Sequence, residues 1–128
     1  MRITRVLYVE DNIDMSEMIP RLLGKSYRIT AVETCADALL TAKREHFGLY
    51  LIDNLLPDGT GIDLCREIRT FDRDTPIIFC SGFTDDSHQR LAFDAGANDF
   101  LQKPFDTDQL LAAIAHVRRR KRSASWRR

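Results

Sequence analysis

Short apolar runs alternate with stretches of helical periodicity along the whole chain, and this alternation constrains the fold most. Apolar runs predict strands at residues 5–9, 28–32, 49–53 and 76–80, with a short one near 99–102. Apolar residues three and four positions apart predict helices between the strands. These helices cover residues 15–23, about 35–46, 61–71 and 85–95, with a last helix beginning near Thr107 or Asp108.

Five strands alternating with five helices are typical of a (βα)5 α/β domain whose parallel sheet is covered on both faces. Right-handed crossovers favour the flavodoxin-like doubly wound order 2-1-3-4-5. Pro20 within the first helical pattern predicts a kink or a late helix start, and Gly24 is a candidate C-cap. In the second helical stretch, the residues expected to face the core are Ala36, Leu39, Leu40 and Phe47.

Composition fits one cytosolic domain. The 128 residues are enough for a single core, and no apolar run approaches the roughly 20 residues that span a bilayer. No secretory signal precedes the first strand. The three cysteines have no C-x-x-C spacing, which favours a reducing cytoplasm. Residues 1–117 carry a net charge of −7 and residues 118–128 carry +7, which predicts an acidic domain followed by a basic tail or linker.

Acidic and hydroxyl side chains stand where the apolar strands end. Glu10 and Asp11 follow the first strand, Asp53 closes the third, and Ser81 follows the fourth. In the predicted order these strands meet at the switch point of the sheet, where ligands of such folds bind. Carboxylates gathered there repel one another unless a cation joins them, and Mg²⁺ prefers oxygen ligands. The sequence therefore predicts a Mg²⁺ site.

The same residues suit phosphoryl transfer, which depends on positioning and charge neutralisation. Asp53 is the candidate nucleophile, and its second oxygen can hold the metal together with Glu10 and Asp11. The backbone carbonyl of Leu55 is a further candidate ligand. Lys103 is expected to pair with the phosphoryl group, and the Ser81 hydroxyl to bond one of its oxygens. The predicted product is a phospho-aspartate.

The chain resembles the receiver domain of two-component response regulators over residues 3 to about 117. The resemblance is carried by four ordered segments: Val9-Glu-Asp11, Ile52-Asp53 with Leu56-Pro57-Asp58-Gly59, Ser81, and Gly96-Ala-Asn-Asp-Phe-Leu-Gln-Lys-Pro-Phe105. It implies that Asp53 is the phosphoacceptor, Glu10 and Asp11 the metal acids, and Lys103 the lysine of the site. Ser81 and Phe100 would be the switch residues, with a cis Lys103–Pro104 bond.

The resemblance implies a signalling phosphoacceptor and not an enzyme. The donor would be a histidine kinase or a histidine phosphotransfer protein. Phosphorylation would change the surface formed by the fourth helix, the fifth strand and the fifth helix, and this surface would control a partner or effector domain. Whether the chain forms a homodimer is left open by the sequence. In the family that the chain resembles, the residues two positions after Asp53 and after Ser81 tune the phosphate lifetime. Here they are the bulky Leu55 and Phe83, so self-dephosphorylation is expected to be slow.

Other hypotheses remain at this point. The chain can be a stand-alone regulator, a fragment of a longer DNA-binding regulator or hybrid histidine kinase, or a docking module that works without phosphorylation. No membrane partner is predicted, and nucleic acid is not expected to bind this segment. An FMN-binding flavodoxin needs a phosphate-binding loop where this chain has Glu10-Asp-Asn-Ile-Asp14, which repels phosphate. A haloacid-dehalogenase-type phosphatase places its aspartate nucleophile after the first strand, whereas the candidate nucleophile here, Asp53, closes the third strand.

Overall fold

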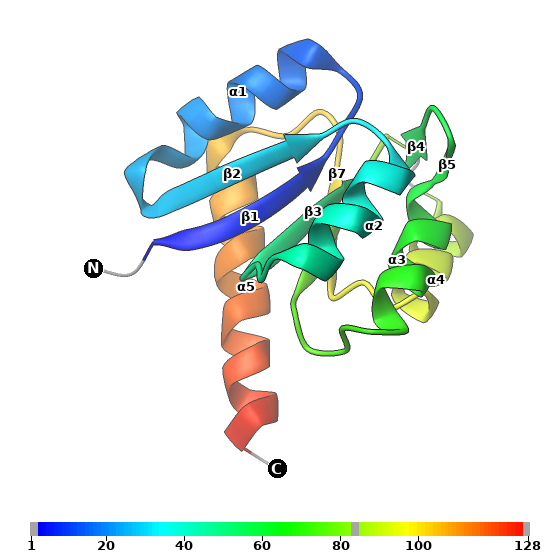
Figure 1. Cartoon of the computed structure of the whole chain (residues 1–128). Helices are drawn as coiled ribbons and strands as arrows, with labels where there is room; N and C mark the ends of the chain where they lie inside the picture. Colours follow the sequence, from blue (N-terminus) through cyan, green and yellow to red (C-terminus); the bar gives the residue numbers. More distant parts are fainter. Residues whose placement is uncertain (1–2, 83–84, 127–128) are drawn as a thin grey trace.

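The computed structural model describes residues 3–82 and 85–126, with side chains described as far as residue 119. Five parallel strands form one sheet in the order β2-β1-β3-β6-β7, with helices on both sides (Figure 1). Taken in chain order, these strands have the predicted order 2-1-3-4-5. The strands are β1 (Thr4–Val9), β2 (Tyr27–Val32), β3 (Leu49–Asp53), β6 (Ile77–Ser81) and β7 (Asp99–Gln102). The helices are α1 (Ile13–Leu23), α2 (Cys35–Arg44), α3 (Gly61–Arg69), α4 (Asp86–Asp94) and α5 (Thr107–Trp126), and a short 3-10 turn, η1 (Gly24–Ser26), follows α1.

A small antiparallel hairpin interrupts the predicted alternation between β3 and α3. It consists of β4 (Leu55–Leu56) and β5 (Gly59–Thr60), paired to each other and not to the main sheet. Leu56-Pro57-Asp58-Gly59 is a turn signal in the sequence, but nothing there indicates two strands. The hairpin matters for function because it follows directly on the end of β3 that carries Asp53.

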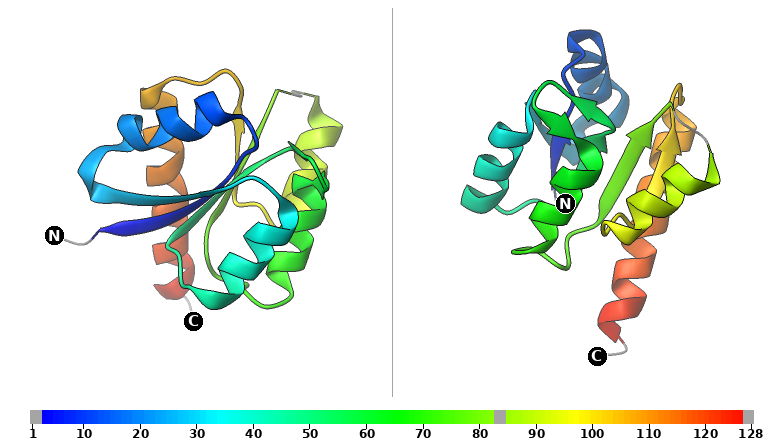
Figure 2. Two further views of the ribbon diagram at one scale, coloured as in Figure 1. Left: turned by 45° about the horizontal axis from the view of Figure 1, so that its top comes forward. Right: turned by 90° about the vertical axis from the view of Figure 1, so that its right-hand side faces the viewer.

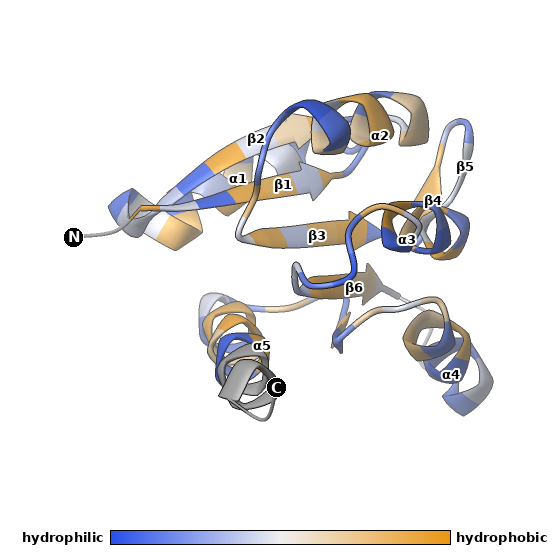
Figure 3. Cartoon of the chain, turned by 60° about the horizontal axis from the view of Figure 1, so that its bottom comes forward, coloured by the Kyte–Doolittle hydropathy of each residue, from blue (hydrophilic) through white to orange (hydrophobic). Residues whose placement is uncertain are grey.

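The sheet separates two apolar cores. Side chains alternate along a strand, so Leu7 and Val9 of β1 contribute to one core while Val6 and Tyr8 contribute to the other. The first core packs under α2, α3 and α4, and the second under α1 and α5. Figures 2 and 3 show α5 on the opposite side of the strands from α3 and α4. Burial on both faces leaves charged groups a place only at the strand ends.

The ends of α1 follow from its capping residues. The side chain of Asn12 accepts a hydrogen bond from the amide of Met15, and Gly24 ends the helix with a φ of 72°, as predicted for a C-cap. The helix begins at Ile13, so the late start considered for Pro20 is wrong. Pro20 lies inside the last turns of α1 instead.

Two of the four residues predicted to face the core here do so: Leu39 of α2 packs partly buried against the core, and Phe47, after the helix, is buried. The prediction is wrong for the other two. Ala36 and Leu40 are exposed, and the helix packs through Ala38 and Ala42. Two residues along a helix amount to a rotation of about 200°, so a helix that turns Ala38 toward the sheet must turn its neighbours at 36 and 40 away. Small side chains at the contact bring α2 close to the strands.

The last helix continues past the acidic domain. α5 runs from Thr107 to Trp126, so the backbone of the basic segment is helical as far as it is described. Within residues 3–82 and 85–126, no helix is both long and apolar enough to cross a membrane.

At the end of the sheet away from the strand termini that carry the acids, Asp72 anchors a polar network. It accepts hydrogen bonds from the hydroxyls of Tyr50 at 2.8 Å and Thr75 at 2.7 Å, and from the amides of Asp74 and Thr75. Partial burial opposes the charge on Asp72, but these hydrogen bonds outweigh it and hold its pKa below the ordinary value of 3.8. The network is therefore built around a carboxylate.

We expect Asp72 to set part of the acid sensitivity of the fold. A carboxyl whose pKa is lowered on folding adds stability above its unfolded pKa, and this is lost as the pH falls through the folded value. Asp72→Asn should reduce the free energy of unfolding near neutral pH by about 1 kcal/mol, allowing for solvent screening. Urea unfolding from neutral pH to below 3.8 should show a flatter pH dependence for the variant. Asp94→Asn, at an exposed side chain of α4, is the control, and equal pH slopes for all three proteins would contradict the expectation.

Candidate metal and phosphoacceptor site

Polar side chains from four strands meet at one edge of the sheet. Glu10 directly follows β1, Asp53 closes β3, Ser81 closes β6 and Lys103 follows β7. The backbone joins these ends, because the amide of Lys103 donates to the carbonyl of Ser81 at 2.8 Å. The sequence prediction that these residues lie together is thus met by the fold.

Three carboxylates form a compact cluster at this edge. One oxygen each from Glu10, Asp11 and Asp53 lie within 4.8 Å of one another. Glu10 and Asp53 are buried, while Asp11 is exposed. Buried carboxylates this close are unfavourable unless positive charge compensates them. Because the oxygens converge and one side opens to water, the donor set fits Mg²⁺, which binds oxygen ligands and retains several waters.

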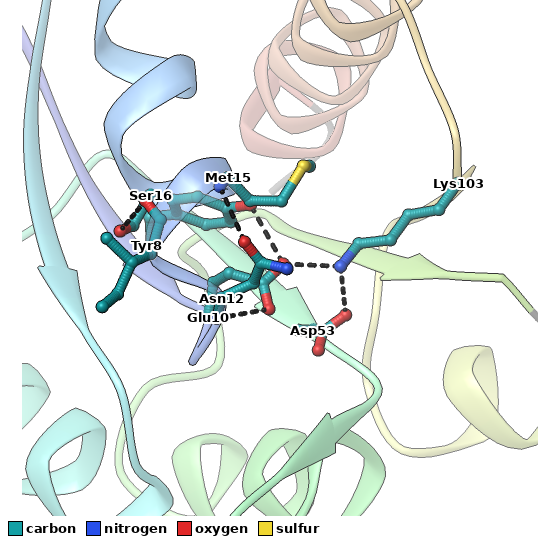
Figure 4. A network of polar contacts seen from close by, with 8 residues as sticks. Tyr8, Glu10, Asn12, Met15, Ser16, Asp53 and Lys103 are labelled. Carbon is teal, nitrogen blue, oxygen red and sulfur yellow. Dashed lines mark hydrogen bonds and ion pairs between the residues drawn. The ribbon is translucent and has the colours of Figure 1, made fainter.

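Among the described residues, Lys103 supplies the positive charge that compensates the clustered carboxylates. Its Nζ lies 2.5 Å from Oε1 of Glu10 and 2.7 Å from Oδ1 of Asp53 (Figure 4). The side chain thus crosses from the loop after β7 to the centre of the site. The Lys103–Pro104 peptide bond is cis, as the sequence predicts.

The electrostatics of the cluster are set by burial and by this lysine. Burial raises the pKa of the Glu10 carboxyl; the hydrogen bond from Lys103 opposes that effect, and the charge of Asp53 adds to it. Burial by itself would lower the pKa of Lys103, but its hydrogen bonds to Asp53 and Glu10 hold that pKa above its usual value. The ammonium form is therefore the one that the site stabilises.

Glu10 has further partners that sequence reasoning did not identify. The hydroxyl of Tyr8, within the buried strand β1, donates to Oε1 of Glu10 at 3.3 Å, and the amide of Asn12 reaches Oε2 at 3.4 Å (Figure 4). Tyr8 reads in the sequence as one more apolar strand residue. The sequence did contain one signal for this contact, since Tyr8 stands two positions before Glu10 and alternate residues of an extended segment share a face.

The backbone beside Asp53 is closely packed. A Cβ on Gly61 would lie 2.1 Å from the carbonyl oxygen of Asp53 and 2.8 Å from the ring of Phe79. The amide of Gly61 donates to the carbonyl of Asn54 at 2.8 Å. Glycine is therefore required where the hairpin returns past the phosphoacceptor candidate. Leu55 lies in β4, and its side chain is 58% exposed.

The hairpin is also tied to α2 by Asp58, which lies in the turn between β4 and β5. The carboxylate of Asp58 accepts from the amides of Cys35 at 2.7 Å and Ala36 at 3.0 Å. These two hydrogen bonds are the largest influences on Asp58 and lower its pKa. The first amides of a helix have no partner within the helix, so Asp58 caps α2 from a distant part of the chain.

The predicted switch residues lie on two neighbouring strands. Ser81 is buried at the end of β6. The ring of Phe100 in β7 is half-buried and packs against Phe79, with centroids 5.9 Å apart, and edge-on against His88 of α4 at 6.2 Å. Nothing in the sequence indicates the contact with His88. Phe83, the second bulky residue expected beside the site, lies outside the described residues.

Fold and site together define a doubly wound α/β domain with a cluster of three acids and a lysine-paired aspartate at the switch point. Comparison with known proteins identifies the family: the family model of the response regulator receiver domain matches residues 6–115, and the chain belongs to this family. The family comprises signalling phosphoacceptor domains of two-component systems and not enzymes in the usual sense.

Individual relatives support the same family. The response regulator ArlR of Staphylococcus aureus is 32% identical over 118 residues, which cover 91% of this chain and 53% of ArlR. The non-phosphorylated HemR receiver domain from Leptospira biflexa is 30% identical, with a TM-score of 0.81 over 89% of this chain and 93% of that one. DrrB, an OmpR/PhoB homologue from Thermotoga maritima, is 27% identical, with a TM-score of 0.83 over 93% of this chain and 54% of DrrB. The chain spans about half the length of the curated relatives that it matches.

Proposed function

We propose that the chain is a phosphorylation-dependent switch in which Asp53 accepts a phosphoryl group from a phosphohistidine. The observation that supports this most directly is the convergence of Glu10, Asp11 and Asp53 within 4.8 Å, with Lys103 bonded to Asp53. In the transfer, an oxygen of Asp53 bonds to phosphorus while the phosphorus–nitrogen bond breaks, and the electron pair remains on the imidazole. The result is an acyl phosphate on Asp53.

Each residue of the site has a role in this proposal. Glu10, Asp11, Asp53 and the backbone carbonyl of Leu55 would hold Mg²⁺, which supplies charge neutralisation for the transferred group when bound. Lys103 already lies 2.7 Å from Asp53, so it is placed to pair with a phosphoryl group there. The Ser81 hydroxyl would donate to another phosphoryl oxygen.

Activation would be a shift between two arrangements of the site. A phosphoryl group that binds Ser81 and Lys103 more favourably in one arrangement stabilises that arrangement. The stabilisation equals the difference in binding free energy between the two arrangements. Phe100 links the site to the surface of α4, β7 and α5, because its ring packs against both Phe79 and His88. We propose that this surface controls a partner protein or an effector domain, and that a second copy of the chain is one candidate partner.

The donor proposed is a histidine kinase or a histidine phosphotransfer protein in the cytoplasm, where the three free cysteines would stay reduced. We take residues 1–117 as the receiver and 118–128 as a tail or linker, because the net charge reverses there. A receiver cut from a longer DNA-binding regulator or hybrid kinase fits the half-length match to ArlR. A docking module that works without phosphorylation is the alternative if the site proves inert.

Incubation with Mg²⁺ and a small acyl-phosphate donor should add the mass of one phosphoryl group to the intact protein. The reaction should stop when the metal is removed with EDTA, because three carboxylates repel an incoming phosphate without a cation. Intact-mass spectrometry measures the gain directly. A phosphoryl gain that persists in EDTA would contradict the Mg²⁺ role. No gain from either the small donor or a phosphohistidine protein, with the fold intact, would favour the docking module.

A further inference from the structure

The two oxygens of the buried Glu10 carboxylate have different surroundings. Oε1 accepts from the Tyr8 hydroxyl at 3.3 Å and from Nζ of Lys103 at 2.5 Å, whereas Oε2 faces the Asn12 amide at 3.4 Å (Figure 4). A carboxylate with two donors on one oxygen is fixed in rotation as well as in position. The oxygen better placed to bind a cation is therefore Oε2, whose one donor among the described contacts is the Asn12 amide.

The Tyr8 hydroxyl is held by the core and not by the site. Its side chain is fully buried, and the ring belongs to the apolar cluster between the sheet and helices α1 and α5. A buried tyrosine hydroxyl requires a partner, and Glu10 is the partner provided. The ring cannot follow changes at the surface of the site as a long lysine side chain can.

We propose that Tyr8 is a positioning residue for the Mg²⁺ site, holding Glu10 so that Oε2 faces the cation. The proposal rests on the proposed function, in which Lys103 pairs with the phosphoryl group on Asp53 and would then give up its contact with Glu10. Once Lys103 has moved, Tyr8 is the side-chain donor that keeps Oε1 of Glu10 in place. The phosphorylated and unphosphorylated forms would then present the same metal acid in the same orientation.

The chain contains a matched control for this role. Tyr50 lies in β3, is buried like Tyr8, and donates its hydroxyl to another carboxylate, that of Asp72, at 2.8 Å. Asp72 belongs to the network at the opposite end of the sheet. Tyr8→Phe and Tyr50→Phe therefore remove the same atom and the same kind of hydrogen bond, but only the first touches a metal acid.

Titration calorimetry of the metal-free protein with Mg²⁺ tests the proposal without any phosphorylation assay. Tyr8→Phe should weaken Mg²⁺ binding about tenfold, the lower range for loss of a residue that orients a metal ligand. Tyr50→Phe should change the affinity less than about twofold, since its network is remote from the ligands. Thermal unfolding of both variants without Mg²⁺ shows whether each remains folded, and phenylalanine fills the same space in the core.

A second measurement probes the shared oxygen. In a Lys103→Met background, Oε1 keeps only Tyr8 of its two side-chain donors, so Tyr8→Phe should weaken Mg²⁺ binding by a larger factor than in the wild type. Equal factors in both backgrounds would overturn the shared-oxygen arrangement. Unchanged or tighter binding by Tyr8→Phe, or equal weakening by Tyr50→Phe, would overturn the positioning role alone. A wild-type chain that binds no Mg²⁺ would overturn the proposed function and the positioning role with it.

Discussion

Asp53→Asn is expected to abolish phosphorylation while leaving the fold intact. The amide has one oxygen of low nucleophilicity and cannot form the acyl phosphate that a carboxylate forms. It also removes one of three carboxylates that converge within 4.8 Å, so repulsion in the metal-free site decreases. The variant should therefore be at least as stable as the wild type without Mg²⁺, and it should gain less stability when Mg²⁺ is added.

Two measurements on the same samples test this expectation. Intact-mass spectrometry after incubation with Mg²⁺ and an acyl-phosphate donor should show no phosphoryl gain, and thermal unfolding should show the smaller Mg²⁺ effect. Asp63→Asn is the matched control, because Asp63 is exposed in the first turn of α3 and its carboxylate pairs only with Arg66 among the described contacts. A phosphoryl gain in Asp53→Asn equal to that of the wild type would place the acceptor elsewhere.

Gly61→Ala is expected to destabilise the fold more than any other single methyl addition at a described glycine. The added Cβ would lie 2.1 Å from the backbone oxygen of Asp53, and backbone cannot rotate away as a side chain can. The loss should be about 3 kcal/mol, although alanine favours the first turn of α3 more than glycine does. Because the clash is with Asp53 itself, phosphorylation of the folded fraction should also slow.

Gly82→Ala provides the comparison for this experiment. A Cβ added at Gly82 would meet no atom within 4 Å, so urea unfolding should differ from the wild type by less than about 0.5 kcal/mol. If Gly61→Ala unfolded at the same urea concentration as Gly82→Ala, the close approach of the hairpin to Asp53 would be disproved.

The sequence was sufficient to predict those features that depend on local pattern. Strand β7 lies at the predicted residues 99–102, and Glu10, Asp53, Ser81 and Lys103 meet at the strand ends as expected. These features are predictable because the spacing of apolar residues indicates whether a segment is a helix or a strand. The order of helices and strands along the chain then indicates which strand ends are neighbours in the sheet.

Features that depend on contacts between distant segments were not predictable in this way. The capping of α2 by Asp58 joins residues 22 and 23 positions apart, and nothing near Cys35 indicates it. The β4–β5 hairpin has strands of two residues each, too short for any periodicity. The wrong placement of Leu40 in α2 has a similar cause, since Leu40 is apolar but lies on the face opposite the buried Ala38 and Ala42.

The contacts of Arg69 determine what kind of motion α4 can make. Its guanidinium donates to the carbonyl of Gly96 at 3.0 Å and to Oδ1 of Asn98 at 2.9 Å, which fastens the C-terminal end of α4 to α3. Gly96 has a φ of 114°, and a Cβ there would meet the Arg69 side chain at 2.5 Å, so this junction is both tight and specific. The other end of α4 carries His88 against Phe100. Because α4 is fastened near Gly96 and contacts Phe100 at its other end, the activation that we propose would tilt α4 about Gly96, and a small displacement of the Phe100 ring would change the helix angle.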